Sequence, residues 1–266
     1  MRFITAFKLN TDISGTLNES NRLRYGYWTL MLSLRSISTF FNGPIELTVI
    51  ADGVPDWLDE TKCTIISQRE YCPLNQLNSN AVESRIFLTE SQSFAYFNDD
   101  FFFGKPCGKE VFFDSDAPVH YLKTRPNIHG KFLKSCNYTR AVLEKRIAGY
   151  KSCKELDAHG ICYYSAEQLQ WLREHFRDEL KRTAASPFRA DNDFNRCALP
   201  EAFVHAGLAV RRDGAASVEM RSLGNPIQWD KTFVCVNDDN GELEAGFQAT
   251  MKLFQKFPKK SIWEKS

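Results

Sequence analysis

The sequence predicts an α/β protein, a sheet flanked by helices. Short apolar runs alternate with helical patterns through the first half of the chain, and this order implies βαβ units. The second half is more helical. The 266 residues show no internal repeat and no low-complexity linker. We therefore expect a single domain over residues 1–266, with a helical sub-lobe at about 125–215.

In the first half, strands are predicted where four to six apolar residues run together, and helices where apolar residues recur every three or four positions. Asn10 to Asn21 is rich in Asn, Ser, Thr and Gly and is predicted to be a loop. The predicted strands are Phe3–Phe7, Ile45–Ile50, Cys63–Ser67 and Phe94–Phe97, and the predicted helices are Tyr27–Phe41 and Ser79–Leu88.

The second half has one clear helix start, a capping box of Ser165 with Gln168 that precedes an apolar stripe reaching about Leu180. The other predicted elements are helices at Asn137–Tyr150, Pro200–Leu208 and Glu242–Phe257, and a strand at Thr232–Val236.

Charge and composition exclude several classes of protein. The chain carries 34 Lys and Arg against 33 Asp and Glu, a net charge of +1, so any phosphate site must be built from a few placed cations. The aromatic residues lie in predicted strands and on helix faces, which indicates a core rather than a nucleic-acid surface. No run of about 18 apolar residues and no signal peptide is found, which favours a cytoplasmic protein.

Two adjacent carboxylates stand between apolar runs in the stretch FAYFNDDFFFGKP. Asp99 and Asp100 follow the predicted strand Phe94–Phe97, and ligands of open α/β sheets bind at the carboxyl ends of strands. Charge placed there needs compensation, and hard oxygen ligands suit Mg²⁺ or Mn²⁺. The alternative is a turn whose solvated Asp residues cap the next segment. Near the C-terminus Asp238 also follows a predicted strand.

The stretch LNSNAVES begins the predicted helix that follows residue 78. Asn78 or Ser79 is a good N-cap, and Glu83 falls in the first turns. A helix N-terminus that points into a crevice binds a phosphate or a sugar hydroxyl. Simple capping explains the same residues.

The helical half contains one His and one Arg in distinctive surroundings. His159 precedes the capping box, where it could act as a general base near neutral pH. Arg189 stands in TAASPFRADND, with Asp191 and Asp193 close by, and an arginine suits bidentate phosphate recognition. A lone His is more often structural or exposed, so both interpretations of His159 stay open.

The order of these motifs is more specific than any one of them. SNAVES, FAYFNDDFFFGKP, a lone His before a capped helix, T-x₄-FR-x₃-D, CVND and FPKKSIWEK follow one another, and residues 33–36 read SLRS. In this order the chain resembles the Stealth family of sugar-1-phosphate transferases, which act in capsule and exopolysaccharide synthesis and include N-acetylglucosamine-1-phosphotransferase. The resemblance covers about residues 22–264.

The resemblance implies a mixed sheet with a glycosyltransferase-A-like nucleotide-sugar core. It implies a single catalytic domain that moves sugar-1-phosphate from a nucleotide sugar, expected to be UDP-linked, to a glycan hydroxyl and releases a nucleoside monophosphate. The metal, Mg²⁺ or Mn²⁺, is expected on Asp99, Asp100 and Asp238. Arg189 is expected to hold the phosphate and His159 to be the base or an orienting donor. The expected substrate-binding residues are Asn78, Asn80, Glu83, Arg35, Asp193 and Lys260.

Two other functions remain open. A metal-dependent glycosyltransferase would use the same acidic pair but release a nucleoside diphosphate. A non-catalytic glycan-binding relative is favoured by the first strand, since Phe3 to Asp12 has no WVDG motif of the kind usual in the family. The segment from Lys252 to Lys265 combines five lysines with aromatic residues, a pattern compatible with peripheral association with the inner face of a membrane.

Overall fold

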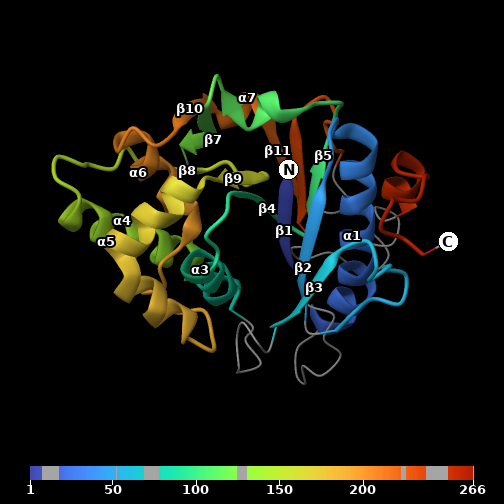
Figure 1. The fold of residues 1–266 in the computed structure, drawn as a ribbon, viewed down its shortest axis with the longest axis horizontal. Helices are drawn as coiled ribbons and strands as arrows, with labels where there is room; N and C mark the ends of the chain where they lie inside the picture. Colours follow the sequence, from blue (N-terminus) through green and yellow to red (C-terminus); the bar gives the residue numbers. More distant parts are fainter. Residues whose placement is uncertain are drawn as a thin grey trace.

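The computed structural model describes residues 1–7, 18–51, 53–68, 78–124, 131–222, 226–237 and 251–265. Its centre is a five-stranded sheet in the order β3-β2-β1-β4-β9 (Figure 1). The first four strands are parallel, and β9 runs antiparallel to β4, so the predicted mixed sheet is confirmed. The bounds of these strands are Arg2–Phe7 (β1), Glu46–Ala51 (β2), Thr64–Ser67 (β3), Phe94–Asn98 (β4) and Cys162–Tyr164 (β9).

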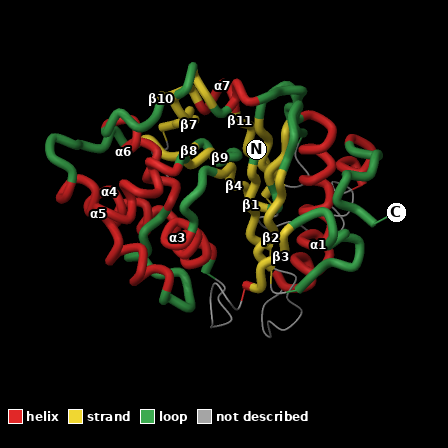
Figure 2. The backbone as a smooth tube through the Cα atoms, viewed as in Figure 1, coloured by secondary structure: helices red, strands yellow, loops and turns green. Residues whose placement is uncertain are grey.

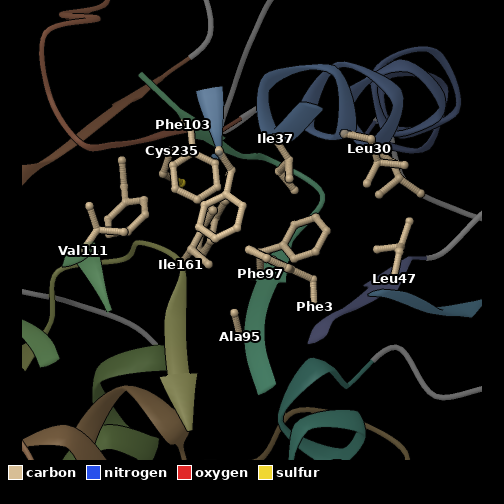
Figure 3. Packing of buried hydrophobic residues seen from close by; sticks show 14 of the residues in the cluster. Phe3, Leu30, Ile37, Leu47, Ala95, Phe97, Phe103, Val111, Ile161 and Cys235 are labelled. Atoms are coloured by element: carbon tan, nitrogen blue, oxygen red, sulfur yellow. The ribbon is translucent and has the colours of Figure 1, made fainter. Parts of the chain in front are cut away.

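Helices cover both faces of this sheet. Helix α1 (Asn18–Phe40) lies on one face, and α3 (Ser79–Thr89) and α5 (Ala166–Ala184) lie on the other (Figure 1). Side chains alternate along β1, so Phe3 packs in the cluster of α1 while Ile4 packs in the cluster of α3 and α5. Figure 3 shows the first cluster, in which Phe3 and Phe97 lie against Ile37 of α1. Burial on both faces fixes the strand register.

Two smaller sheets flank the central one. One has the order β11-β12-β5, and the other has the order β10-β7-β6 with β8 paired to β7. The strands are β5 (Phe101–Phe103), β6 (Phe113–Asp114), β7 (Ala117–Thr124), β8 (Glu155–Asp157), β10 (Val210–Asp213), β11 (Val218–Ser222) and β12 (Phe233–Asn237). The remaining helices are η1 (Lys109–Val111), α4 (Lys131–Arg146), η2 (Arg196–Ala198), α6 (Leu199–His205) and α7 (Gly214–Ser217).

Two predicted boundaries are wrong. Residues 18–21, predicted as loop, form the first turn of α1, because Asn and Ser are as common at helix starts as in loops. Helix α4 begins at Lys131, before the predicted Asn137, and ends at Arg146, and Gly149 then adopts a φ of 74° that a right-handed helix cannot continue through. Of the predicted C-terminal helix, residues 251–256 are helical and residues 242–250 lie outside the described part.

Helices α4, α5 and α6 gather on the side of the sheet away from α1, as Figure 2 shows. The division into one domain with a helical sub-lobe stays a prediction. None of the described helices is long and apolar enough to cross a membrane.

Candidate active site

The start of α3 is tied to a distant loop by one side chain. Asn78 is the N-cap, and its Oδ1 accepts a hydrogen bond from the backbone N of Asn80 at 3.1 Å. Its Nδ2 donates to Asp193 Oδ2 at 2.9 Å and to the carbonyl oxygens of Phe188 at 3.1 Å and Ser186 at 3.3 Å. Asn78 is fully buried. Asn78 therefore caps α3 and also holds the loop of the T-x₄-FR-x₃-D motif, residues 183–193, against the helix.

Asp193 completes this junction from the loop side. Its carboxylate, buried at 2% exposure, also accepts from Asn80 Nδ2 at 3.2 Å and from the backbone N of Ala190 at 3.1 Å. A buried carboxylate is stable only when hydrogen bonds replace water, and three donors do so here. The loop so held presents Arg189, which is exposed and donates from Nη2 to Ser79 Oγ at 2.7 Å. A guanidinium and the N-terminus of α3 thus lie side by side.

Behind this junction lies a network of three buried charges. Glu83 Oε1 accepts from Arg196 Nε at 2.9 Å, and Arg196 Nη1 donates to Asp157 Oδ2 at 2.9 Å. The Arg196 guanidinium lies over the Tyr96 ring, 5.1 Å from its centroid. Burial raises the pKa of the Glu83 carboxyl, while the positive charge of Arg196 opposes that rise. The network joins α3, β4, β8 and η2.

The network reaches His159 through the same Asp157. Asp157 Oδ1 accepts a hydrogen bond from the backbone N of His159 at 3.2 Å. The φ of His159 is 73°, in the left-handed region. The half-buried imidazole packs edge-on to Phe101, with ring centroids 5.1 Å apart. Because Phe101 directly follows Asp100, His159 lies next to the acidic turn at the end of β4.

The acidic pair lies at the carboxyl end of β4, as predicted. Asp99 Oδ2 accepts from Thr29 Oγ1 of α1 at 3.0 Å, and Asp100 Oδ2 accepts from the Cys235 thiol of β12 at 3.5 Å. Both residues are partly buried. Asp238, the third predicted ligand, lies outside the described residues.

The chemistry of the acidic pair suits a hard cation. In the described part of the chain, no group of three or more His, Cys, Asp or Glu side chains is arranged to hold a metal ion. Mg²⁺ commonly takes only one or two carboxylates and completes its shell with water and substrate phosphates. Asp99 and Asp100 fit that pattern.

Two predicted residues lie elsewhere. Arg35 is buried in α1 and forms two hydrogen bonds to Glu264, Nε to Oε1 at 2.9 Å and Nη2 to Oε2 at 2.7 Å. Lys260 is exposed and donates from Nζ to the Lys265 carbonyl at 3.0 Å. Both lie with the C-terminal segment against α1, on the face of the sheet opposite α3 (Figure 1). The structure does not bring them together with Asn78, Glu83 and Arg189.

Sequence reasoning missed Asp157 and Arg196. Arg196 stands 39 residues from Asp157 and 113 residues from Glu83, so no local pattern marks the network. Arg196 lies in FNRCALP, and a charge within an apolar stretch is the only hint of a buried ion pair.

The sequence of this chain is similar to a known protein family and to several exopolysaccharide phosphotransferases. Residues 24–120 match Stealth protein CR2, conserved region 2. The resemblance to the Stealth family is confirmed. The chain is 28% identical over 200 residues to the exopolysaccharide phosphotransferase CpsY of Mycobacterium tuberculosis, covering 69% of this chain and 36% of that protein. It is 26% identical over 252 residues to an exopolysaccharide phosphotransferase of Nocardia farcinica, covering 79% and 47%.

The chain thus spans between about a third and a half of the length of these relatives. The matched Stealth region contains Asn78, Glu83, Asp99 and Asp100, whereas His159 and the Arg189 loop lie beyond it. Contacts link members of the two sets, since Asp193 of the Arg189 loop accepts from Asn78 and His159 packs on Phe101, which follows Asp100.

A structural comparison confirms the predicted glycosyltransferase-A-like fold. A crystal structure of the galactosyltransferase LgtC in complex with donor and acceptor sugar analogues superposes with a TM-score of 0.52, covering 97% of each chain. Sequence identity is 9%, so this likeness concerns the fold alone.

Proposed function

We propose that this Stealth chain transfers sugar-1-phosphate from a nucleotide sugar to a glycan hydroxyl in capsule or exopolysaccharide synthesis, releasing a nucleoside monophosphate. One observation carries the proposal: the loop of T-x₄-FR-x₃-D is bound to the N-terminus of α3 through Asn78 and Asp193, and it holds Arg189 there. The names of the relatives, exopolysaccharide phosphotransferases, support the same reaction class.

Arg189 and the α3 N-terminus supply the binding of the transferred phosphate. A guanidinium fork matches two phosphate oxygens, and the helix end adds a partial positive charge. Arg189 is exposed, and Ser79 Oγ holds its Nη2. In this proposal it stabilises the negative charge on the equatorial oxygens as the bond between the phosphates breaks.

His159 is the proposed base. The acceptor oxygen forms a bond to the sugar-bearing phosphorus, and its proton passes to the imidazole. The bond from that phosphorus to the bridging oxygen breaks, and the nucleoside monophosphate leaves with the bonding electrons. Mg²⁺ or Mn²⁺ held by Asp99 and Asp100 would supply Lewis-acid neutralisation of the diphosphate.

Incubation with a UDP-sugar, Mg²⁺ and a glycan acceptor tests the reaction. Release of UMP supports the proposal, and release of UDP rejects it in favour of a glycosyltransferase. Arg189→Lys keeps the charge but loses the fork, so we expect kcat to fall at least about tenfold. Arg177→Lys, an exposed change on α5, is the matched control and should leave kcat unchanged.

The glycosyltransferase is the second candidate, because the similar fold of LgtC belongs to an enzyme of that kind. A non-catalytic glycan-binding relative is the third. Asp99→Ala with Asp100→Ala separates it: unchanged biological output from a folded variant would favour the non-catalytic protein. The cytoplasmic location, the peripheral membrane association and the UDP-linked donor stay predictions.

A further inference from the structure

The backbone of His159 is held in a conformation that costs free energy. A non-glycine residue in the left-handed region is less stable than in the right-handed one by roughly 1–2 kcal/mol. The φ of His159 is 73°, and the hydrogen bond from its backbone N to Asp157 Oδ1, at 3.2 Å, favours that conformation. Asp157 therefore has one oxygen committed to the backbone of the proposed base.

The other oxygen of Asp157 is committed to Arg196. Arg196 binds Asp157 and Glu83 at 2.9 Å each, and the side chains of Arg196, Asp157 and Glu83 are 2%, 2% and 7% exposed. Buried ion pairs are often no more stable than apolar residues of equal size. Stability alone therefore does not explain three buried charges at this place.

The position of the network suggests another role. Arg196 connects Asp157, and through it His159, to Glu83 in the helix whose N-terminus lies beside Arg189. Its guanidinium also rests on Tyr96 of β4, the strand that ends just before Asp99. Helix α3, the end of β4 and the His159 turn are thus fixed relative to one another through one side chain.

We propose that Asp157 and Arg196 are positioning residues, which set the place of the His159 imidazole relative to the phosphate-binding end of α3 and the acidic turn after β4. This inference rests on the proposed function for the role of His159. Both residues act on kcat through His159 rather than through contact with substrate. Displacing a reacting group by about 1 Å costs on the order of 100-fold in rate.

Asp157→Asn tests the role with little change in side-chain volume. The variant leaves Arg196 and Glu83 as a neutral buried pair. The replacing amide has one oxygen in place of two, so it accepts from His159 N or from Arg196, but not from both in the geometry of the carboxylate. We expect kcat for UMP release to fall about 10- to 100-fold with KM for the nucleotide sugar changed less than about threefold.

Glu201→Gln is the matched control. Glu201 is another buried carboxylate of the same half and accepts from Tyr150 OH at 3.1 Å and Ser152 Oγ at 2.7 Å. These partners, like the backbone N of Cys153 that also donates to it, are not among the predicted site residues. We expect Glu201→Gln to lower the melting temperature and to leave kcat unchanged.

A second readout does not depend on activity. The chain has five His residues, so the Cε1–H resonance of His159 is assigned in the NMR spectrum by comparison with His159→Asn. The inference predicts that Asp157→Asn shifts this resonance and lowers kcat, while Glu201→Gln does neither. Any other result for the Asp157 variant overturns the inference. A wild-type protein that releases no UMP refutes the proposed function instead, and the resonance still tests the placement of His159.

Discussion

Asn78→Asp distinguishes a cap from a cross-link. Asp caps helices about as well as Asn, and its charge interacts favourably with the helix N-terminus by about 0.3–1 kcal/mol. If Asn78 were only the N-cap of α3, the substitution would be neutral or stabilising. The structure gives Asn78 three further roles, as a donor to Asp193, Phe188 and Ser186.

The magnitude follows from the 2.9 Å between Asn78 Nδ2 and Asp193 Oδ2. Two carboxylates about 3 Å apart repel by roughly 5 kcal/mol at an effective dielectric constant of about 20. Protonating one of the two carboxylates relieves this repulsion and costs about 4 kcal/mol at pH 7, because each pKa unit is about 1.4 kcal/mol. This cost is the upper limit of the destabilisation. We therefore expect Asn78→Asp to lower the free energy of unfolding by about 3–4 kcal/mol at pH 7.

The Asn78→Asp variant should recover part of this stability in acid. At pH 5 protonation costs only about 1.5 kcal/mol, and a protonated Asp can donate to Asp193. Urea unfolding followed by circular dichroism at both pH values measures the difference. Ser165→Asp, at the N-cap of α5, serves as the control because the Ser165 side chain caps its own helix. A loss below about 0.5 kcal/mol for Asn78→Asp at pH 7, roughly the scatter of surface substitutions, would refute the cross-link.

Three further predictions concern stability. Burial lowers the pKa of His120 from 6.5 to about 4, so the contribution of the neutral imidazole to stability is complete above pH 6.5 and is lost as pH falls to 4. Between pH 7 and 4, the free energy of unfolding measured with urea should therefore fall by about 3 kcal/mol more for wild type than for His120→Gln. Equal losses in the two proteins would contradict this. Gly214→Ala places a Cβ 2.3 Å from the Cβ of Ala158, so thermal unfolding should show a loss of about 1–3 kcal/mol, whereas an unchanged melting temperature would speak against the close approach. Glu264→Gln leaves Arg35 buried without its counter-charge and should cost about 3 kcal/mol, with faster proteolysis of the C-terminal segment; wild-type resistance to protease would show that the pair does not anchor it.

The sequence predicted the local features of the fold because each has a local cause. The capping box of Ser165 and Gln168 is present, and Asn78 caps α3 as expected. The apolar run Phe94–Phe97 forms the core of β4. The two caps depend on neighbouring residues alone, and the apolar run marks β4 although its partners β1 and β9 are distant in sequence.

The sequence did not predict features that depend on distant partners. Residues 101–103 form strand β5 because β12, far along the chain at Phe233–Asn237, pairs with them. Arg196 finds Glu83 and Asp157 only after folding, and Arg35 finds Glu264 at the far end of the chain. The order of the motifs predicts that Arg189, His159 and Asp99 share one site, which stays a prediction, and it could not show the buried charges of Glu83, Asp157 and Arg196.

The fate of the phosphate that carries the sugar tests the proposed reaction most directly. A UDP-sugar labelled with ³²P in that phosphate is incubated with the chain, Mg²⁺ and a glycan acceptor. Sugar-1-phosphate transfer predicts that the label enters the glycan while unlabelled UMP is released, and that Arg189→Lys reduces both together. Label that remains in UDP, with unlabelled sugar in the glycan, would contradict the proposal.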